Sequence, residues 1–370
     1  MKILNNKYTQ NFDFIILFTV IIIFSLGIIN LYGSLSIHHK DFFDPYVIKQ
    51  LVWFVVSILI MALIISIDYN TLIEAAYYIY GFILIFIVIV LVKGRITHGA
   101  SRWISLGMFS FQPSELMKIA LIFALVKYFT TYENKKGYNL RSLAIPFIII
   151  LIPVLFIAKE PDLGTSLIVL FIGLIIIFLA GIKRNSMLIL AGIILVTGPV
   201  LWFRLKSYQK SRILIFLHPA KDYLGAGYNI IQSEIAVGAG RLFGDGFGNG
   251  SQSTLDFLPA KHTDFIFSTY MQQFGFIGGL VLIVLYFIVI IRGFKIVYRA
   301  KKLQGFLLGG GALAIITFHA IINMFMTVGL LPVVGVPLPF FSYGGTSLVV
   351  DMSAVAILLN ISMRRYKFQS

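Results

Sequence analysis

Long apolar stretches separated by short polar segments run through the whole chain. About ten of them approach the length of roughly 20 residues that a helix needs to cross the hydrocarbon core of a bilayer. Helices satisfy their own backbone hydrogen bonds in lipid, whereas the strands of a membrane barrel alternate apolar and polar positions. The pattern therefore predicts about ten membrane-spanning helices, at residues 13–33, 47–67, 72–92, 115–130, 143–158, 163–182, 186–203, 264–291, 306–330 and 344–362.

Composition strengthens this prediction of an all-α, multi-spanning membrane protein. The chain has 370 residues, of which 59% are hydrophobic and only 12% charged, and its mean hydropathy is +0.93. A soluble domain would be about a quarter charged, so a water-soluble globular enzyme is excluded. The polar residues 1–13 precede an apolar run long enough to be retained as a span, so no cleaved signal is expected. The chain has no cysteine, which excludes disulfides and thiolate chemistry.

The net charge of +15 is distributed unevenly along the chain. With ten spans both termini lie on one side, and the short loops of that side hold most of the loop Lys and Arg, so the positive-inside rule predicts cytoplasmic termini. These residues are Lys2, Lys7, Lys135, Lys136, Arg141, Lys183, Arg184, Arg292, Lys295, Arg299, Lys301, Lys302, Arg364, Arg365 and Lys367. The charge thus has a membrane explanation, and no nucleic-acid partner is expected.

One segment, about residues 204–263, breaks the charge pattern. It forms a large loop between the seventh and eighth predicted helices, and the topology places it outside the cell, within a single domain of residues 1–370. Long loops are exempt from the orientation rule, so its basic residues require another explanation. They are Arg204, Lys206, Lys210, Arg212, Lys221, Arg241 and Lys261. Apolar residues among its many glycines favour an ordered segment.

Asp264 is the first candidate for chemistry, because it opens an apolar span directly after Lys261, His262 and Thr263. A carboxylate there can cap the amides at a helix start. It can equally act as a general base at the membrane surface, next to a basic loop. The residues alone leave both interpretations open.

Two further groups of ionisable residues lie at the ends of predicted helices. Glu115 and Lys118 are three residues apart, so they share a helix face and can form either a structural ion pair or part of a site. Arg102 lies just before them and could bind a phosphate. Glu160 and Asp162 occupy a tight turn, where they can cap a helix, balance a basic cleft or hold a hydrated cation.

Polar residues also fall inside the last two predicted spans. His319, Asn323 and Asp351 are of this kind, and Asp351 is expensive in lipid, so we expect it to face other helices. The intervening segment 329–345 contains three prolines and several glycines. Such irregular backbone is tolerated at membrane depth only where it is buried in protein or faces a cavity.

Several of these segments together resemble one family, the SEDS proteins (shape, elongation, division and sporulation). Each is weak alone, but they occur in family order over nearly the whole chain. Short termini and the sequence Phe-Leu-Pro before His-Thr-Asp favour the elongation branch. The matching segments are 99–104 (GASRWI), 112–115 (QPSE), 160–165 (EPDLGT), 225–229 (GAGYN) with Gln232 and Ser233, 257–267 (FLPAKHTDFIF) and 329–345 (GLLP to SYGG).

The resemblance implies a peptidoglycan glycosyltransferase. Such proteins polymerise lipid II at the outer face of the cytoplasmic membrane and release polyprenyl pyrophosphate. They work with a class B penicillin-binding protein, a transpeptidase, and with other membrane proteins of the elongation complex. The family needs the Asp of the His-Thr-Asp motif, here Asp264. Members commonly carry an acidic pair about two turns later, where this chain has Gln272 and Gln273.

A glycosyl transfer assigns roles to the residues singled out above. Asp264 is the predicted base, and a pyrophosphate leaving group needs positive charge rather than an acid. The predicted substrate-binding residues are Arg102, Lys118, Arg212, Lys261 and His262. The predicted supporting residues are Glu115, Glu160, Asp162, Gln232 and Ser233. No metal ligands are predicted, and the use of a divalent cation is left open.

Two other classes of function remain open. A flippase would bind the same anionic lipid, so the basic loop does not discriminate against it. Charged residues deep in the spans would favour transport. Few are present, and Asp351 is the exception. A non-enzymatic scaffold of the elongation complex would keep its function after Asp264 is replaced.

Overall fold

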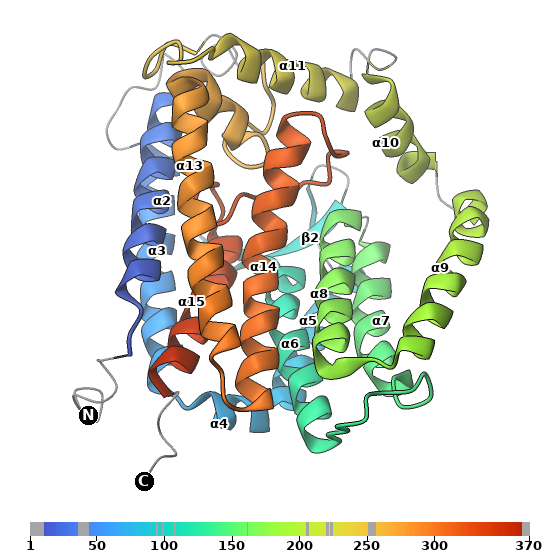
Figure 1. Ribbon diagram of the computed structural model, residues 1–370. Coiled ribbons are helices and arrows are strands. Elements are labelled where there is room, and N and C mark those ends of the chain that lie inside the picture. The colour runs from blue at the N-terminus through green and yellow to red at the C-terminus, as the bar shows by residue number, and fades with distance from the viewer. Residues whose placement is uncertain are drawn as a thin grey trace.

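The protein is a bundle of long helices that run side by side (Figure 1). The computed structural model describes residues 11–35, 44–93, 95–97, 100–106, 109–160, 162–204, 207–219, 222, 225–250 and 257–364. The long helices are α2 (Phe14–Gly33), α3 (Pro45–Ser66), α5 (Ala76–Lys93), α6 (Pro113–Thr131), α7 (Ala144–Lys159), α8 (Leu163–Gly181), α9 (Arg184–Arg204), α13 (Ile266–Tyr298), α14 (Leu303–Thr327) and α15 (Gly345–Arg364). A short helix, α4 (Tyr69–Glu74), follows α3.

Each predicted span overlaps one of these helices. Six of them, α2, α3, α8, α13, α14 and α15, are long and apolar enough to cross a membrane. Large side chains such as Leu63, Phe178 and Phe287 project from the outside of the bundle, as expected for surfaces that face lipid. A mainly helical, multi-spanning membrane protein is thereby confirmed, and a full set of ten crossings stays a prediction.

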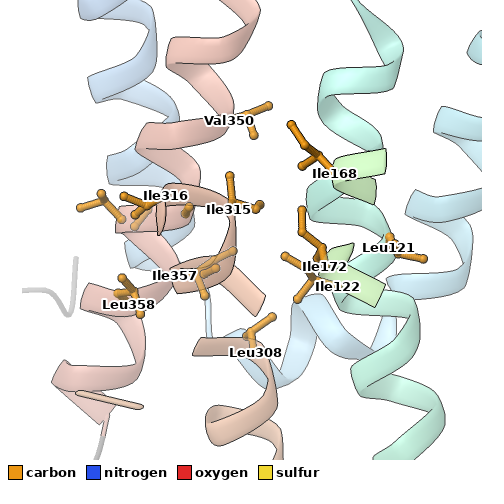
Figure 2. Packing of buried hydrophobic residues seen from close by; sticks show 14 of the residues in the cluster. Leu121, Ile122, Ile168, Ile172, Leu308, Ile315, Ile316, Val350, Ile357 and Leu358 are labelled. Carbon is orange, nitrogen blue, oxygen red and sulfur yellow. The ribbon is translucent and has the colours of Figure 1, made fainter. Parts of the chain in front are cut away.

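Helix α15 lies at the centre of the bundle and is buried over its whole span. A helix that is apolar on every side belongs in a core. Figure 2 shows Val350, Ile357 and Leu358 of α15 close to apolar residues of α6, α8 and α14. Asp351 lies in this helix and is buried, which confirms that it faces other helices.

A small antiparallel sheet between α5 and α6 departs from the all-helical prediction. Its strands are β1 (Arg95–Thr97), β2 (Ala100–Leu106) and β3 (Phe109–Phe111), in the order β1-β2-β3. Ser105 pairs with Ser110, and Leu106 with Phe109. β1 and β3 have three residues each and carry too little alternation to be distinguished from a loop in the sequence.

The segment predicted as a large loop contains two helices, α10 (Ser207–Leu217) and α11 (Ala226–Ala239). Both lie at the end of the bundle opposite the start of α2 and the end of α15 (Figure 1). Ser233 anchors α11, because its Oγ donates to the carbonyl oxygen of Thr327 at 2.6 Å and lies 2.5 Å from Ser268 Oγ. This contact fixes α11 to α13 and α14, next to the start of α13.

Candidate active site

A cavity of about 230 Å³ opens where the turn before α13 meets the irregular segment before α15. It combines residues that are far apart in the sequence, contributed by β2, α6, α8 and these two loop segments. Its lining consists of Trp103, Gln112, Glu115, Asp162, Thr165, Thr263, Asp264, Gly335, Pro337, Tyr343, Gly344 and Ser347. The lining mixes apolar surface with polar side chains, three of which are carboxylates, although the cavity lies among apolar helices.

Asp264 belongs to the turn that precedes α13 and not to the helix itself. The helix begins at Ile266, and its N-cap residue is Phe265, without a side-chain capping bond. Asp264 is therefore not the N-cap residue of α13. The side chain is half-buried and lines the cavity. A Cβ atom on Gly335 would lie 3.4 Å from Asp264 Oδ2, which places the carboxyl against the backbone of the segment before α15.

Backbone hydrogen bonds hold the turn around Asp264 to that segment. The N–H of Tyr343 donates to the carbonyl oxygen of His262 at 2.9 Å, and Ser342 Oγ donates to that of Thr263 at 2.7 Å. Gln50 of α3 in turn bonds the Ser342 carbonyl and the Gly344 N–H. Because the turn itself makes no regular structure, these bonds determine where the Asp264 backbone lies.

The other side of the cavity is formed by the starts of α6 and α8. Asp162 caps α8 by accepting the N–H of Thr165 on Oδ1, and its Oδ2 accepts the side chain of Gln112 at 2.8 Å. Gly164 allows a close approach here, since a Cβ atom on it would lie 2.1 Å from the Val334 carbonyl oxygen. Asp162 is thus both a cap and part of the cavity lining.

Glu115 and Lys118 form a buried ion pair on α6, with 2.7 Å between Glu115 Oε1 and Lys118 Nζ. Glu115 lines the cavity, whereas Lys118 lies one turn deeper and is not part of the lining. Lys118 Nζ is also 2.8 Å from His319 Nε2. Lys118 is therefore placed to hold Glu115, and a direct grip on substrate is not the role its position favours.

The other predicted basic residues lie differently. Lys261 is buried and is not among the lining residues, and His262 packs between Ser34, whose Oγ is 3.2 Å from its Nδ1, and the ring of Tyr46. Arg102 in β2 and Arg212 in α10 have side chains that fall outside the described part of the structure. Among the lining side chains that the structure describes, Glu115, Asp162 and Asp264 carry the formal charges.

Three predicted supporting residues lie away from the cavity. Glu160 is buried at the end of α7, Ser233 anchors α11, and Gln232 is half-buried on α11. Sequence reasoning did not assign roles to Tyr343, whose N–H bonds the turn, or to Asn323, which bonds Asp264. The prolines and glycines of the segment before α15 were the one feature of the sequence that pointed to a role of this segment in the site.

Gln272 and Gln273, which stand where the resemblance led us to expect an acidic pair, are buried and make structural contacts. Gln273 Nε2 donates to Asn30 Oδ1 at 3.0 Å, and its Oε1 accepts the N–H of Gly248 at 3.3 Å. Gln272 donates to Asp245 at 3.4 Å. In the described ranges, no group of three or more His, Asp or Glu side chains could hold a metal ion.

A helical membrane bundle with a carboxylate-lined cavity defines the general class of this protein. The particular family follows from comparison with known proteins: residues 13–367 match the FtsW/RodA/SpoVE family of cell cycle proteins. The chain belongs to this family, which is the SEDS family that its motifs resemble.

Individual relatives agree with this assignment. The chain is 42% identical to the peptidoglycan glycosyltransferase MrdB of Escherichia coli over 291 residues, 78% of each chain. It is 37% identical to the probable peptidoglycan glycosyltransferase FtsW of Trichlorobacter lovleyi over 95% of this chain and 93% of the relative. Stage V sporulation protein E of Bacillus subtilis is 34% identical over 95% and 96%.

Solved structures share the fold over nearly the whole length. A chain from a peptidoglycan synthase complex that coordinates polymerization and crosslinking superposes with a TM-score of 0.82 at 30% identity, covering 96% of this chain and 99% of that one. The rod shape determining protein RodA of Thermus thermophilus gives a TM-score of 0.70 at 27% identity, covering 96% and 98%.

Proposed function

We propose that this protein is a peptidoglycan glycosyltransferase that polymerises lipid II during cell elongation, with Asp264 as the general base. Family membership and relatives that are named peptidoglycan glycosyltransferases support the activity. The observation that carries the assignment of the base is the position of Asp264, a half-buried carboxylate that lines the cavity and precedes the N-cap residue of α13.

The proposed reaction joins two lipid-linked sugars. Asp264 takes the proton of the 4-hydroxyl on the acceptor's GlcNAc, and that oxygen attacks the anomeric carbon of the donor. The bond between this carbon and the pyrophosphate oxygen breaks, and polyprenyl pyrophosphate departs with the electron pair. Attack by one base-activated hydroxyl on the face opposite the leaving group inverts the anomeric carbon, unlike a retaining scheme with a carboxylate nucleophile.

Pyrophosphate carries its own negative charge, so three carboxylates in the cavity would repel it unless cations face them. Arg102 and Arg212 are the predicted basic residues that remain for this task. Arg102 directly precedes Trp103, which lines the cavity, and Arg212 belongs to α10 at the same end of the bundle. The use of a divalent cation is left open, and a direct role for Lys261 stays a prediction.

The proposed orientation places both termini in the cytoplasm and the cavity toward the outside. The distribution of Lys and Arg in the short loops supports it. Helix α2 begins and helix α15 ends at one end of the bundle, while α10 and α11 cover the other end (Figure 1). Lipid II would be the substrate on the outer side, and a class B penicillin-binding protein the partner. The similar chain in a peptidoglycan synthase complex supports such a partnership.

Replacement of one oxygen tests the base. Asp264→Asn keeps the size of the side chain, and we expect polymerisation of purified lipid II to fall by about 100-fold or more, in the range for general bases. Asp245→Asn is the matched control, because Asp245 is an exposed carboxylate that does not line the cavity. Polymerisation by Asp264→Asn at the wild-type rate would refute the assignment.

The same reconstituted vesicles separate the rival functions. A polymerase converts labelled lipid II into glycan strands that are resolved on a gel. A flippase would move the label between leaflets and leave it monomeric. A scaffold would support cell elongation equally well with Asp264→Asn, at unchanged expression.

A further inference from the structure

A chain of buried ionisable side chains leads from the cavity into the centre of the bundle. It begins at Glu115, which lines the cavity, and continues through Lys118 of the same helix to His319 of α14 and Asp351 of α15. The exposed fractions of Lys118, His319 and Asp351 are 1%, 0% and 1%. Four ionisable groups this deep in apolar surroundings are costly, and the proposed transfer does not by itself use the last two.

The contacts determine which atoms carry protons. The Lys118 ammonium has only donors, so His319 Nε2 at 2.8 Å must accept. The proton of the neutral imidazole then lies on Nδ1, which faces Asp351 Oδ1 at 3.4 Å. A protonated imidazole would point a second positive donor at Lys118. His319 Nδ1 and Asp351 Oδ1 make no hydrogen bond of ordinary geometry, and it is the negative charge of Asp351 beside the ring that favours the orientation in which its lone pair meets Lys118.

Asp351 also reaches the segment that forms the opposite wall of the cavity. The backbone N–H of Phe340 lies near its carboxylate. Phe340 has a φ of +62°, an uncommon conformation for a residue with a side chain. One carboxylate thus lies beside both the imidazole and the segment that carries Gly335 and Pro337 into the cavity.

At the cavity end of this series of ionisable side chains, one carboxylate oxygen makes no hydrogen bond in the described part of the protein. Glu115 Oε1 accepts from Lys118, whereas its buried Oε2 has no hydrogen-bond partner in the described part of the protein. A buried carboxylate oxygen without a donor is expensive, so it is available to a hydroxyl or amide N–H of a bound sugar.

We propose that His319 and Asp351 are positioning residues for the glycosyl transfer: they fix Lys118, and Lys118 fixes Glu115 so that its second oxygen meets the substrate. The inference rests on the proposed function, since it concerns the same cavity. It assigns His319 and Asp351 no contact with substrate. Their effect passes through Lys118, which is held from one side by Glu115 and from the other by the imidazole.

The test compares His319 variants of the full chain, reconstituted with its partner transpeptidase and assayed with lipid II. His319→Leu removes the acceptor for Lys118. We expect kcat to fall at least about tenfold and KM to stay within about twofold of the wild-type value. A misplaced group lowers the rate of the chemical step more than it weakens substrate binding. His319→Gln provides a neutral acceptor and should keep at least about a third of the rate. Asp351→Asn should lie between the two.

Ser353→Ala is the matched control. Ser353 is buried on α15, two residues after Asp351, but its hydroxyl bonds only Val349 of its own helix. We expect this variant to keep the wild-type rate. A wild-type rate in His319→Leu would overturn the proposal. So would a His319→Gln rate as low as that of His319→Leu, because the imidazole would then be needed for proton transfer and not for placement.

A second readout does not depend on activity. If His319 acts through Lys118, the fall in melting temperature of the double variant His319→Leu with Lys118→Met is smaller than the sum of the two single falls. Strict additivity would overturn the proposal. Failure of the proposed base looks different, because Asp264→Asn would then polymerise lipid II while the ranking of the His319 variants stayed the same.

Discussion

Asn323 donates a hydrogen bond of 3.0 Å from its side-chain amide to the backbone carbonyl oxygen of Asp264. The same nitrogen donates to the carbonyl oxygen of Val336 at 2.7 Å. A single buried side chain of α14 therefore joins the turn that carries the proposed base to the segment before α15. These two parts of the cavity wall are held together by this amide.

Replacement of Asn323 by Ala should loosen both sides at once. Two carbonyl groups lose their donor, and each unsatisfied buried group costs about 1–3 kcal/mol. We expect a lower melting temperature and a loss of polymerisation of about tenfold or more, because the reacting groups lose their alignment. Thr317→Val is the control on the same helix, since Thr317 bonds only Leu313 within α14. Equal rates in the two variants would contradict this role.

The sequence predicted the helices well because the length and apolar character of a span are local properties. The cavity is not local. Asn323 and Asp264 are 59 residues apart, and Gln50 and Ser342 are 292 apart. Apolar periodicity indicates that a helix is buried but not which neighbour it meets, so these bonds could not be read from it.

The ionisable candidate residues show the same difference between local features, which the sequence predicts, and the exact ends of helices, which it does not. Spacing predicted the Glu115–Lys118 pair, because residues three apart share a helix face. It could not distinguish a cap from a base at Asp264, since the two differ only in whether the helix begins at Ile266 or earlier. Predicted helix ends are uncertain by more than that.

Gly164 should tolerate no side chain. A Cβ atom there would lie 2.1 Å from the Val334 carbonyl oxygen, so Gly164→Ala must displace α8 from the segment before α15. We expect destabilisation of about 1–3 kcal/mol, as for overpacked cores, and a reduced rate. Gly192→Ala on α9 has no atom within 4 Å of the new Cβ, and by helix propensity it should be neutral or stabilise by about 1 kcal/mol. Thermal unfolding of both variants measures the difference.

Gln273→Glu would place an acid where the resemblance to the SEDS family led us to expect one. In this chain the change replaces the amide that donates to Asn30 Oδ1 with a buried carboxylate oxygen, so two acceptors would face each other. We expect a loss of stability of about 1–3 kcal/mol and no gain in polymerisation rate. Gln232→Glu, at a half-buried position on α11, is the control for the added charge. A faster or more stable Gln273→Glu protein would show that this position still accommodates an acidic function.

Asp13 allows stability to be separated from catalysis. It caps α2 by accepting the Ile16 N–H at 3.2 Å, and it forms an ion pair with Arg292, with 2.7 Å between Asp13 Oδ2 and a terminal guanidinium nitrogen. Asp13→Asn should keep the cap and lose the charge; the Arg292 side chain is 29% exposed but that of Asp13 only 8%, so we expect a cost of about 1–3 kcal/mol, the range for a hydrogen-bonded charged group. Asp13→Ala should cost about 1 kcal/mol more, the value of an N-cap.

Neither Asp13 variant should change the rate per folded molecule. The pair lies at the start of α2, whereas Ser34 at the other end of this 20-residue helix contacts His262, about 30 Å away at the rise of an α-helix. Melting temperatures and initial rates of lipid II polymerisation, measured on the same preparations, separate the two effects. If removal of the Asp13 charge lowers the polymerisation rate but leaves the melting temperature unchanged, the proposed cytoplasmic end is coupled to the cavity through α2 and α13.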